Sequence, residues 1–165
     1  MTARYQYMTT EALLAEIKTA FPPVAMPRKS DLRVHHDGCY HCDFLARDID
    51  NFRGEPVGDA VIRVLHRELS SLSAKGWVWA LPHYLPFCLR PEAKYDQSET
   101  EFLLYSLAPE KEFEADKRHQ FSALSRQQVT CLIHFVEWLK GHPHWSAYCL
   151  SEIQTALDFL ESLDP

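Results

Sequence analysis

Apolar residues recur every three or four positions along most of this chain, which is the spacing of an amphipathic helix. This spacing predicts helices at 10–21, 42–52, 59–72, 73–89, 98–107, 125–141 and from Pro143 onward, with 110–121 as a further, charged candidate. No two segments alternate as paired strands do, although 31–36 is compatible with one short extended piece. We therefore predict a mainly α fold: a compact single-domain bundle of about seven helices spanning 1–165, with an irregular N-terminal loop region.

The segment 77–89 differs from the other predicted helices because it is apolar on nearly every side. A helix with that composition is usually the central, buried one. Its two prolines, Pro82 and Pro86, each remove a backbone hydrogen bond, so a kink or a break is expected there. Trp79 lies off the main apolar stripe, and it is predicted to be either core or, if exposed, an anchor for a partner protein.

Composition limits the class of protein. The chain has 165 residues, of which 46% are hydrophobic and 24% charged, and this composition excludes a disordered or fibrous chain and suits one globular domain. No apolar stretch reaches the ~20 residues that span a bilayer. The N-terminal residues show no signal-peptide pattern, and an odd number of cysteines, five, argues against a disulfide framework. These features predict a cytoplasmic protein with no membrane partner.

The net charge of −6 is concentrated in one segment. Between positions 92 and 116 there are eight acidic residues and two lysines, which gives −6, so the rest of the chain is neutral. An acidic protein is a poor ligand for nucleic-acid phosphates, and direct nucleic-acid binding is not expected. A concentrated negative surface instead attracts a basic protein. We predict such an acidic patch at Glu110, Glu112, Glu114 and Asp116, with a merely solvated face as the alternative.

One constellation has clear chemical potential, the run His35-His36-Asp37-Gly38-Cys39-Tyr40-His41-Cys42. Two cysteines at C-x-x-C spacing can bind one zinc ion, because a single turn brings both thiolates to the same point. The predicted metal ligands are Cys39, Cys42 and His36, with His35 as an alternative imidazole. The chain has no second C-x-x-C pair, although a complete structural zinc site usually shows one.

The same cysteines have two other interpretations. A C-x-x-C pair also occurs in thiol-redox sites, but these lie at a strand-to-helix junction that the chain does not predict. Alternatively, Cys39 and Cys42 are small hydrophobic residues packed where a polar loop enters a helix. Cys88, Cys131 and Cys149 lie on or beside apolar stripes and are predicted to be inert, buried thiols.

A resemblance supports the helical prediction. The elements that carry it are GCYHCDFLARDIDNFRG, a helix ending in Leu72-Ser73, an aromatic segment closing with Tyr84-Leu85-Pro86, and the helix from Glu101 to Leu107. Over roughly 35–140 this order of elements resembles an uncharacterised family of small bacterial proteins, a domain of unknown function. The resemblance implies a helical bacterial protein and no activity for any residue.

Catalytic motifs are otherwise missing, since the sequence holds no G-x-S-x-G, P-loop, H-E-x-x-H or G-x-G-x-x-G pattern. We therefore expect a non-catalytic interaction module, inhibitor- or immunity-like, that binds a basic partner protein through the acidic patch. The alternatives are a zinc-binding module or metal-dependent enzyme that uses the HHDGCYHC segment, and a thiol-redox protein.

Overall fold

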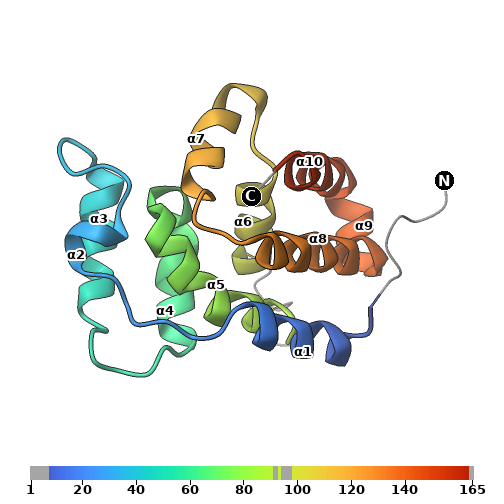
Figure 1. Ribbon diagram of the computed structural model, residues 1–165, viewed down its shortest axis with the longest axis horizontal. Helices are drawn as coiled ribbons and strands as arrows, with labels where there is room; N and C mark the ends of the chain where they lie inside the picture. The colour runs from blue at the N-terminus through green and yellow to red at the C-terminus, as the bar shows by residue number, and fades with distance from the viewer. Residues whose placement is uncertain (1–7, 91–92, 94–97, 164–165) are drawn as a thin grey trace.

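The computed structural model describes residues 8–90, 93 and 98–163 (Figure 1). The described residues form ten α-helices, which confirms the mainly α prediction. They are α1 (Thr10–Ala20), α2 (Lys29–Leu32), α3 (Tyr40–Asp50), α4 (Asp59–Leu65), α5 (Ala74–Cys88), α6 (Ser98–Leu107), α7 (Glu114–Gln120), α8 (Arg126–Gly141), α9 (Pro143–Tyr148) and α10 (Leu150–Glu161). Two short 3₁₀ helices, η1 (His66–Ser71) and η3 (Lys111–Phe113), precede α5 and α7.

The helices form two groups with α5 between them (Figure 1). At one end, α2 and α3 lie together, and α3 contacts η1 and α4. At the other end, α8 packs against α1, α9 and α10, and α10 also contacts α6. Since η1 contacts α3, α4 and α6, it joins the two groups.

The core is built around α5. Trp77, Leu81 and Leu85 on this helix are 0% exposed, and Trp79 and Tyr84 are 1% exposed, so both of its sides are buried. Each large apolar side chain removed from water contributes roughly 1.5–3 kcal/mol. The Tyr84 hydroxyl donates a hydrogen bond to the Glu99 carbonyl at 2.6 Å, which satisfies the one polar group that this ring buries.

Three helices begin at the polar caps that their sequences suggest. The side chains of Thr9, Ser73 and Ser125 each accept a hydrogen bond from a backbone N–H of the first turn. At α8, the Gln128 side chain also accepts from the Ser125 N–H, which completes a capping box. These caps fix where α1, α5 and α8 start.

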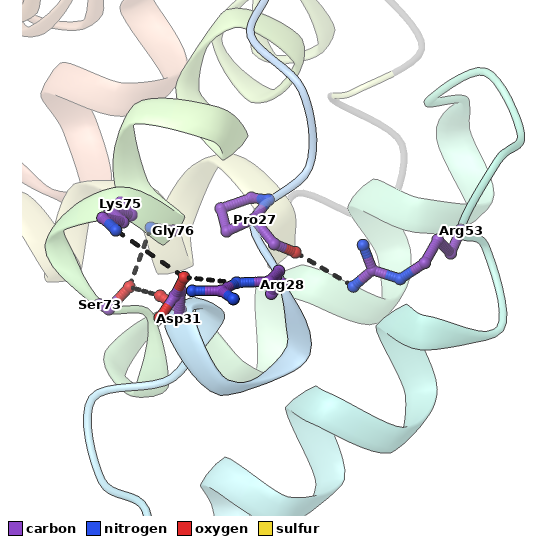
Figure 2. Close-up of polar contacts among 7 residues, drawn as sticks. All are labelled: Pro27, Arg28, Asp31, Arg53, Ser73, Lys75 and Gly76. Carbon is purple, nitrogen blue, oxygen red and sulfur yellow. Dashed lines mark hydrogen bonds and ion pairs between the residues drawn. The ribbon is translucent and has the colours of Figure 1, made fainter.

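A network of polar contacts joins the end of α2 to the start of α5 (Figure 2). The Ser73 hydroxyl donates to the Asp31 carbonyl and accepts from the Gly76 N–H at 3.0 Å. The Asp31 carboxylate pairs with Arg28 at 3.3 Å and with Lys75 at 3.8 Å. The short helix α2 is therefore anchored to the start of the central helix.

The structure corrects three expectations about elements. The sequence predicts about seven helices, but α2 is an additional helix, and Cys149, with non-helical backbone angles, separates α9 from α10. The prediction of an extended piece at 31–36 is wrong for Asp31 and Leu32, which are helical. Only one isolated bridge, between Arg33 and Leu72, forms in this segment. Of the kink or break expected in 77–89, the break is wrong, because α5 continues as one helix through Pro82 and Pro86. Within the described residues, no helix combines the length and the hydropathy that a membrane span requires.

Candidate functional site

The loop before α3 is held in place on both sides. Arg33 forms a bridge with Leu72, and the Val34 N–H donates to the Ser71 carbonyl at 2.9 Å. The chain then turns at Gly38, whose φ of +72° is the left-handed conformation that favours glycine. This turn leads directly into α3, with Cys39 as its N-cap residue.

Three side chains converge at this turn: His35, Cys39 and Cys42. Each offers one ligand atom, and these three atoms all lie within 4.8 Å of one another. The Cys42 sulfur is 3.7 Å from His35 Nδ1. His35 is exposed, Cys39 is half-buried and Cys42 is 1% exposed, so the cluster opens to solvent on the histidine side.

The two thiols lie in different electrostatic environments. The side chain and the backbone N–H of Cys42 both donate to the Cys39 sulfur, and these hydrogen bonds lower the pKa of Cys39 to about 7. Burial, by contrast, raises the pKa of Cys42. A sulfur at the N-cap of a helix is additionally favoured as an anion by the helix dipole. Cys39 is therefore the more readily ionised thiol.

An ion pair and a histidine–carboxylate contact hold the start of α3 against its neighbours. Arg33, in the preceding loop, pairs with Asp43 in the first turn of α3. His41 Nδ1 lies 3.1 Å from Glu68 on η1. Both contacts constrain the residues beside the two cysteines, as outer contacts around metal ligands do.

The cluster fits a tetrahedral metal such as zinc. With Zn–S bonds of about 2.3 Å and Zn–N bonds of about 2.0–2.1 Å, neighbouring ligand atoms in a tetrahedron lie about 3.5–3.8 Å apart. The 3.7 Å between the Cys42 sulfur and His35 Nδ1 lies within this range, and no separation among the three ligand atoms exceeds 4.8 Å. Two thiolates and one imidazole are also the donors that zinc prefers.

The structure brings together the two predicted cysteines but not the histidine that the sequence analysis places first. His36 is exposed and is not part of the cluster, whereas His35, its alternative, contacts Cys42. The turn through Gly38 decides which imidazole reaches the thiols, and spacing alone does not distinguish residues three and four positions before Cys39.

The residues of the predicted acidic patch differ in exposure. Glu110, Glu112 and Asp116 are exposed around η3 and the start of α7, while Glu114 is half-buried and lies 3.8 Å from Arg118. Elsewhere in the acidic segment, Glu99 is buried at 3% exposure and lies 3.7 Å from Arg63, and Glu101 accepts a hydrogen bond from Tyr105. Glu92, Lys94 and Asp96 lie outside the described residues.

Trp79 is not a surface anchor. Its side chain is 1% exposed, so it belongs to the core and offers no surface to a partner. The exposed aromatic residue nearest in sequence to the acidic residues is Phe113, which is 54% exposed between Glu112 and Glu114.

A groove that sequence reasoning missed lies between η1, α6, η3, α7 and α10. It has a volume of about 990 Å³, and its apolar wall includes Phe102, Tyr105 and Phe113, which are 43%, 46% and 54% exposed. Lys117 also lines it, although that side chain is only 8% exposed. No motif marks this groove, because its walls come from four stretches that are separated in the sequence: η1, α6, η3 with α7, and α10.

The fold and the cysteine cluster define a small, all-helical domain with a candidate metal centre at the start of one helix. The chain belongs to a family of unknown function (DUF6714), whose model matches residues 9–147. This match confirms that the chain is a member of an uncharacterised family. No curated protein and no solved structure matches the chain.

Proposed function

We propose that this protein binds one zinc ion through His35, Cys39 and Cys42. The observation that carries the proposal is the convergence of three zinc-preferring ligand atoms within 4.8 Å of one another, on a loop whose start is held by backbone hydrogen bonds to Ser71 and Ser73. Two of the donors are thiols that a single helical turn presents side by side. A preformed cluster of this kind needs little rearrangement to accept the ion.

Among the residues that the structure describes, the proposed site has three protein ligands, which leaves one coordination position open. His35 is exposed and Cys39 is half-buried, so that fourth position faces solvent. Structural zinc sites are closed by four protein ligands, whereas sites that act on a substrate keep one position for water. Zinc bound here would lower the pKa of such a water, and His35, Cys39 and Cys42 would hold the ion. The geometry therefore favours an open site over a purely structural one.

Metal content measured on matched variants tests the proposal. Protein stripped with a chelator, reloaded with zinc and desalted is expected to hold about one zinc ion per chain by elemental analysis. Cys39→Ser and His35→Ala should lose most of this zinc, and His36→Gln, which changes the exposed neighbouring imidazole, should retain it. Reloading with Co²⁺ should give a thiolate charge-transfer absorption in the wild type that Cys39→Ser lacks.

Zinc retained by a Cys39→Ser/Cys42→Ser double variant would rule the site out. Absence of zinc from the wild type would do the same, and the thiol-redox alternative would then predict a Cys39–Cys42 disulfide after treatment with oxidised glutathione. Circular dichroism of each variant shows whether lost zinc reflects lost folding.

A second candidate function is recognition of a basic protein, favoured by one surface feature. Phe113 is 54% exposed, and Glu110, Glu112 and Asp116 are exposed on the same short stretch of chain. An exposed aromatic ring bordered by carboxylates suits a partner that presents lysine or arginine, because the ring supplies contact area and the charges steer association. The acidic residues contribute mainly to the rate of association.

Surface variants test this second function independently of the metal. Phe113→Ala should weaken capture of a partner from lysate at any salt concentration, and Glu110→Gln/Glu112→Gln/Asp116→Asn should weaken it mainly at low salt. Glu55→Gln, an exposed carboxylate on the loop after α3, is the matched control. Unchanged capture by both surface variants would contradict the proposal.

A further inference from the structure

We propose that the groove between η1, α6, α7 and α10 binds a small organic acid, with Lys117 receiving the carboxylate and the aromatic wall receiving an apolar body. This inference is independent of the zinc site, because the residues that line the groove do not include His35, Cys39 or Cys42. It rests on the position of Lys117, on the rigidity of the groove and on the chemistry of its wall.

Lys117 is a buried cation that no carboxylate of the described residues pairs with. Its side chain is 8% exposed, and within that part of the chain its ammonium group contacts aromatic rings, lying 5.3 Å from the Trp77 ring centre and 5.6 Å from that of Phe121. Ring faces compensate only in part for the hydration that a largely buried ammonium group loses. The pKa of Lys117 is lowered to about 8 by burial. An anion entering the groove would supply the missing partner.

The walls around Lys117 are held by two contacts from the last turn of α7. The Gln120 side chain donates to the Ser70 carbonyl at 2.7 Å, which ties α7 to η1. Arg118 donates to the carbonyl and the hydroxyl oxygens of Ser162, at 3.1 and 2.7 Å, which ties α7 to the end of α10. The groove is therefore bounded by connected elements, as preformed ligand sites are.

The remainder of the groove suits an uncharged, apolar body. Phe102 and Tyr105 extend along α6, and His66 packs edge-on against Phe102 with ring centres 5.3 Å apart. His66 Nδ1 is buried and has no hydrogen-bond partner among the described residues. A short acid with an aromatic or aliphatic body combines these requirements.

Charged residues of both signs line the groove, so the position of each charge matters more for ligand binding than the total charge. Glu110, Glu114 and Glu152 line it, and so do Arg67 and Lys111 in addition to Lys117, which gives three groups of each sign. Overall charge therefore favours neither anions nor cations. Selectivity for an acid depends on Lys117, because it is buried at 8% exposure and its attraction is less weakened by solvent than that of exposed charges.

Calorimetric titration with three acids and their neutral amides tests the proposal. The probes are 4-phenylbutanoate, octanoate and indole-3-acetate, each paired with its primary amide. At least one acid should bind the wild type ten-fold or more tightly than its amide. Lys117→Met, which keeps side-chain length without charge, should reduce the affinity for the acid to that for the amide, while Lys18→Met, which changes an exposed lysine outside the groove, should leave it within two-fold.

Three results would overturn the proposal: no binding of any acid, equal affinity for acid and amide, or unchanged binding by Lys117→Met. Circular dichroism and gel filtration establish that the variants are folded. Lys117→Arg provides a second check, since it retains the charge and should bind the acid more tightly than Lys117→Met does. Equal binding by those two folded variants would also contradict the assignment.

Discussion

At the scale of single residues, burial divides the five cysteines into two classes. Cys88, Cys131 and Cys149 are 3%, 0% and 3% exposed, and burial is the first cause that raises the pKa of each. For Cys88 and Cys131 the pKa rises to about 12. Cys39, in contrast, is half-buried at a helix N-cap, where hydrogen bonds stabilise its thiolate. Since the thiolate is the reactive form, these environments should determine reactivity.

We expect metal-free protein to react with an aromatic disulfide reagent in two separate phases. Cys39, followed by Cys42, should account for the fast phase, and the other three thiols should react only as fast as the protein unfolds. Absorbance of the released thiolate measures both phases. Cys39→Ser should remove the fast phase, and a native protein in which more than two thiols react rapidly would contradict this prediction.

The sequence predicts residue environments well where periodicity decides them. Cys88, Cys131 and Cys149 lie on helical stripes, and the structure confirms that they are buried. Prediction from the sequence fails where the path of a loop determines a contact. His35, rather than His36, reaches the thiols because of the turn at Gly38. The sequence leaves two environments open for Trp79 because α5 is apolar on both sides, and only packing shows that neither side is exposed.

At the scale of elements, the contact of α5 with the end of α2 depends on a glycine. A Cβ atom added at Gly76 would lie 2.6 Å from the Leu32 carbonyl oxygen and 3.0 Å from Leu72 Cδ2. The Ser73 N–H also donates to this Leu32 carbonyl at 2.9 Å, so the oxygen is not free to move away. The sequence alone suggests the opposite, because alanine has the higher helix propensity.

Gly76→Ala is therefore expected to lower the free energy of unfolding by roughly 1–3 kcal/mol, despite its gain of up to ~1 kcal/mol in helix propensity. Urea denaturation followed by circular dichroism measures the change. Gly58→Ala serves as control, because nothing lies within 4 Å of a Cβ atom there and its φ is −114°. A Gly76→Ala variant as stable as the wild type would show that α2 and α5 separate easily.

The capping box of α8 gives a second prediction for an element. Ser125 accepts from the Gln128 N–H at 3.2 Å, and Gln128 accepts from the Ser125 N–H at 3.0 Å. Ser125→Ala should lower the free energy of unfolding by about 1 kcal/mol, because it leaves an N–H of the first turn without its partner. Urea denaturation measures the loss, and Gln127→Ala, which alters an exposed residue of the same turn, is the matched control. Equal losses in both variants would contradict a specific role for the cap.

Helix positions are predictable to within a few residues for most elements, since caps and apolar stripes are local. The short helix α2 and the division between α9 and α10 are not, because they depend on contacts made after the chain has folded. The same is true of the groove: its lining residues are spread from His66 to Thr155, and no local pattern marks them as neighbours.

At the scale of the whole molecule, η1 lies between the two candidate sites. Glu68 on η1 contacts His41 beside the cysteine cluster, while His66, Arg67, Leu69 and Ser70 of the same 3₁₀ helix line the groove. The cluster belongs to the end of the molecule formed by α2 and α3, and the groove is bounded by α6, α7 and α10 (Figure 1). Each site can therefore be altered by a substitution that leaves the other intact.

Lys117 also links the groove to the stability of the whole fold. Its pKa is lowered from 10.5 to about 8 by burial, so between pH 8 and 10.5 the unfolded chain holds a proton that the folded protein has released. Wherever the unfolded state binds more protons, stability rises with pH. The free energy of unfolding should therefore increase across this window, by ~3 kcal/mol at most from this group, and the charged lysine should be a destabilising feature at neutral pH.

Urea denaturation at pH 7.5, 9 and 10 is expected to show this rise as a difference between proteins. The wild type and Lys111→Met, which alters an exposed lysine of the same groove, should both show the rise in the free energy of unfolding that comes from Lys117. Lys117→Met should not show it. Other groups that titrate in this range, the free thiols among them, contribute equally to all three proteins and cancel in the comparison. At pH 7.5 Lys117→Met should also be the most stable of the three. Parallel stability curves for Lys117→Met and wild type would show that the ammonium group is fully solvated, which would remove the basis for an anion partner at this position.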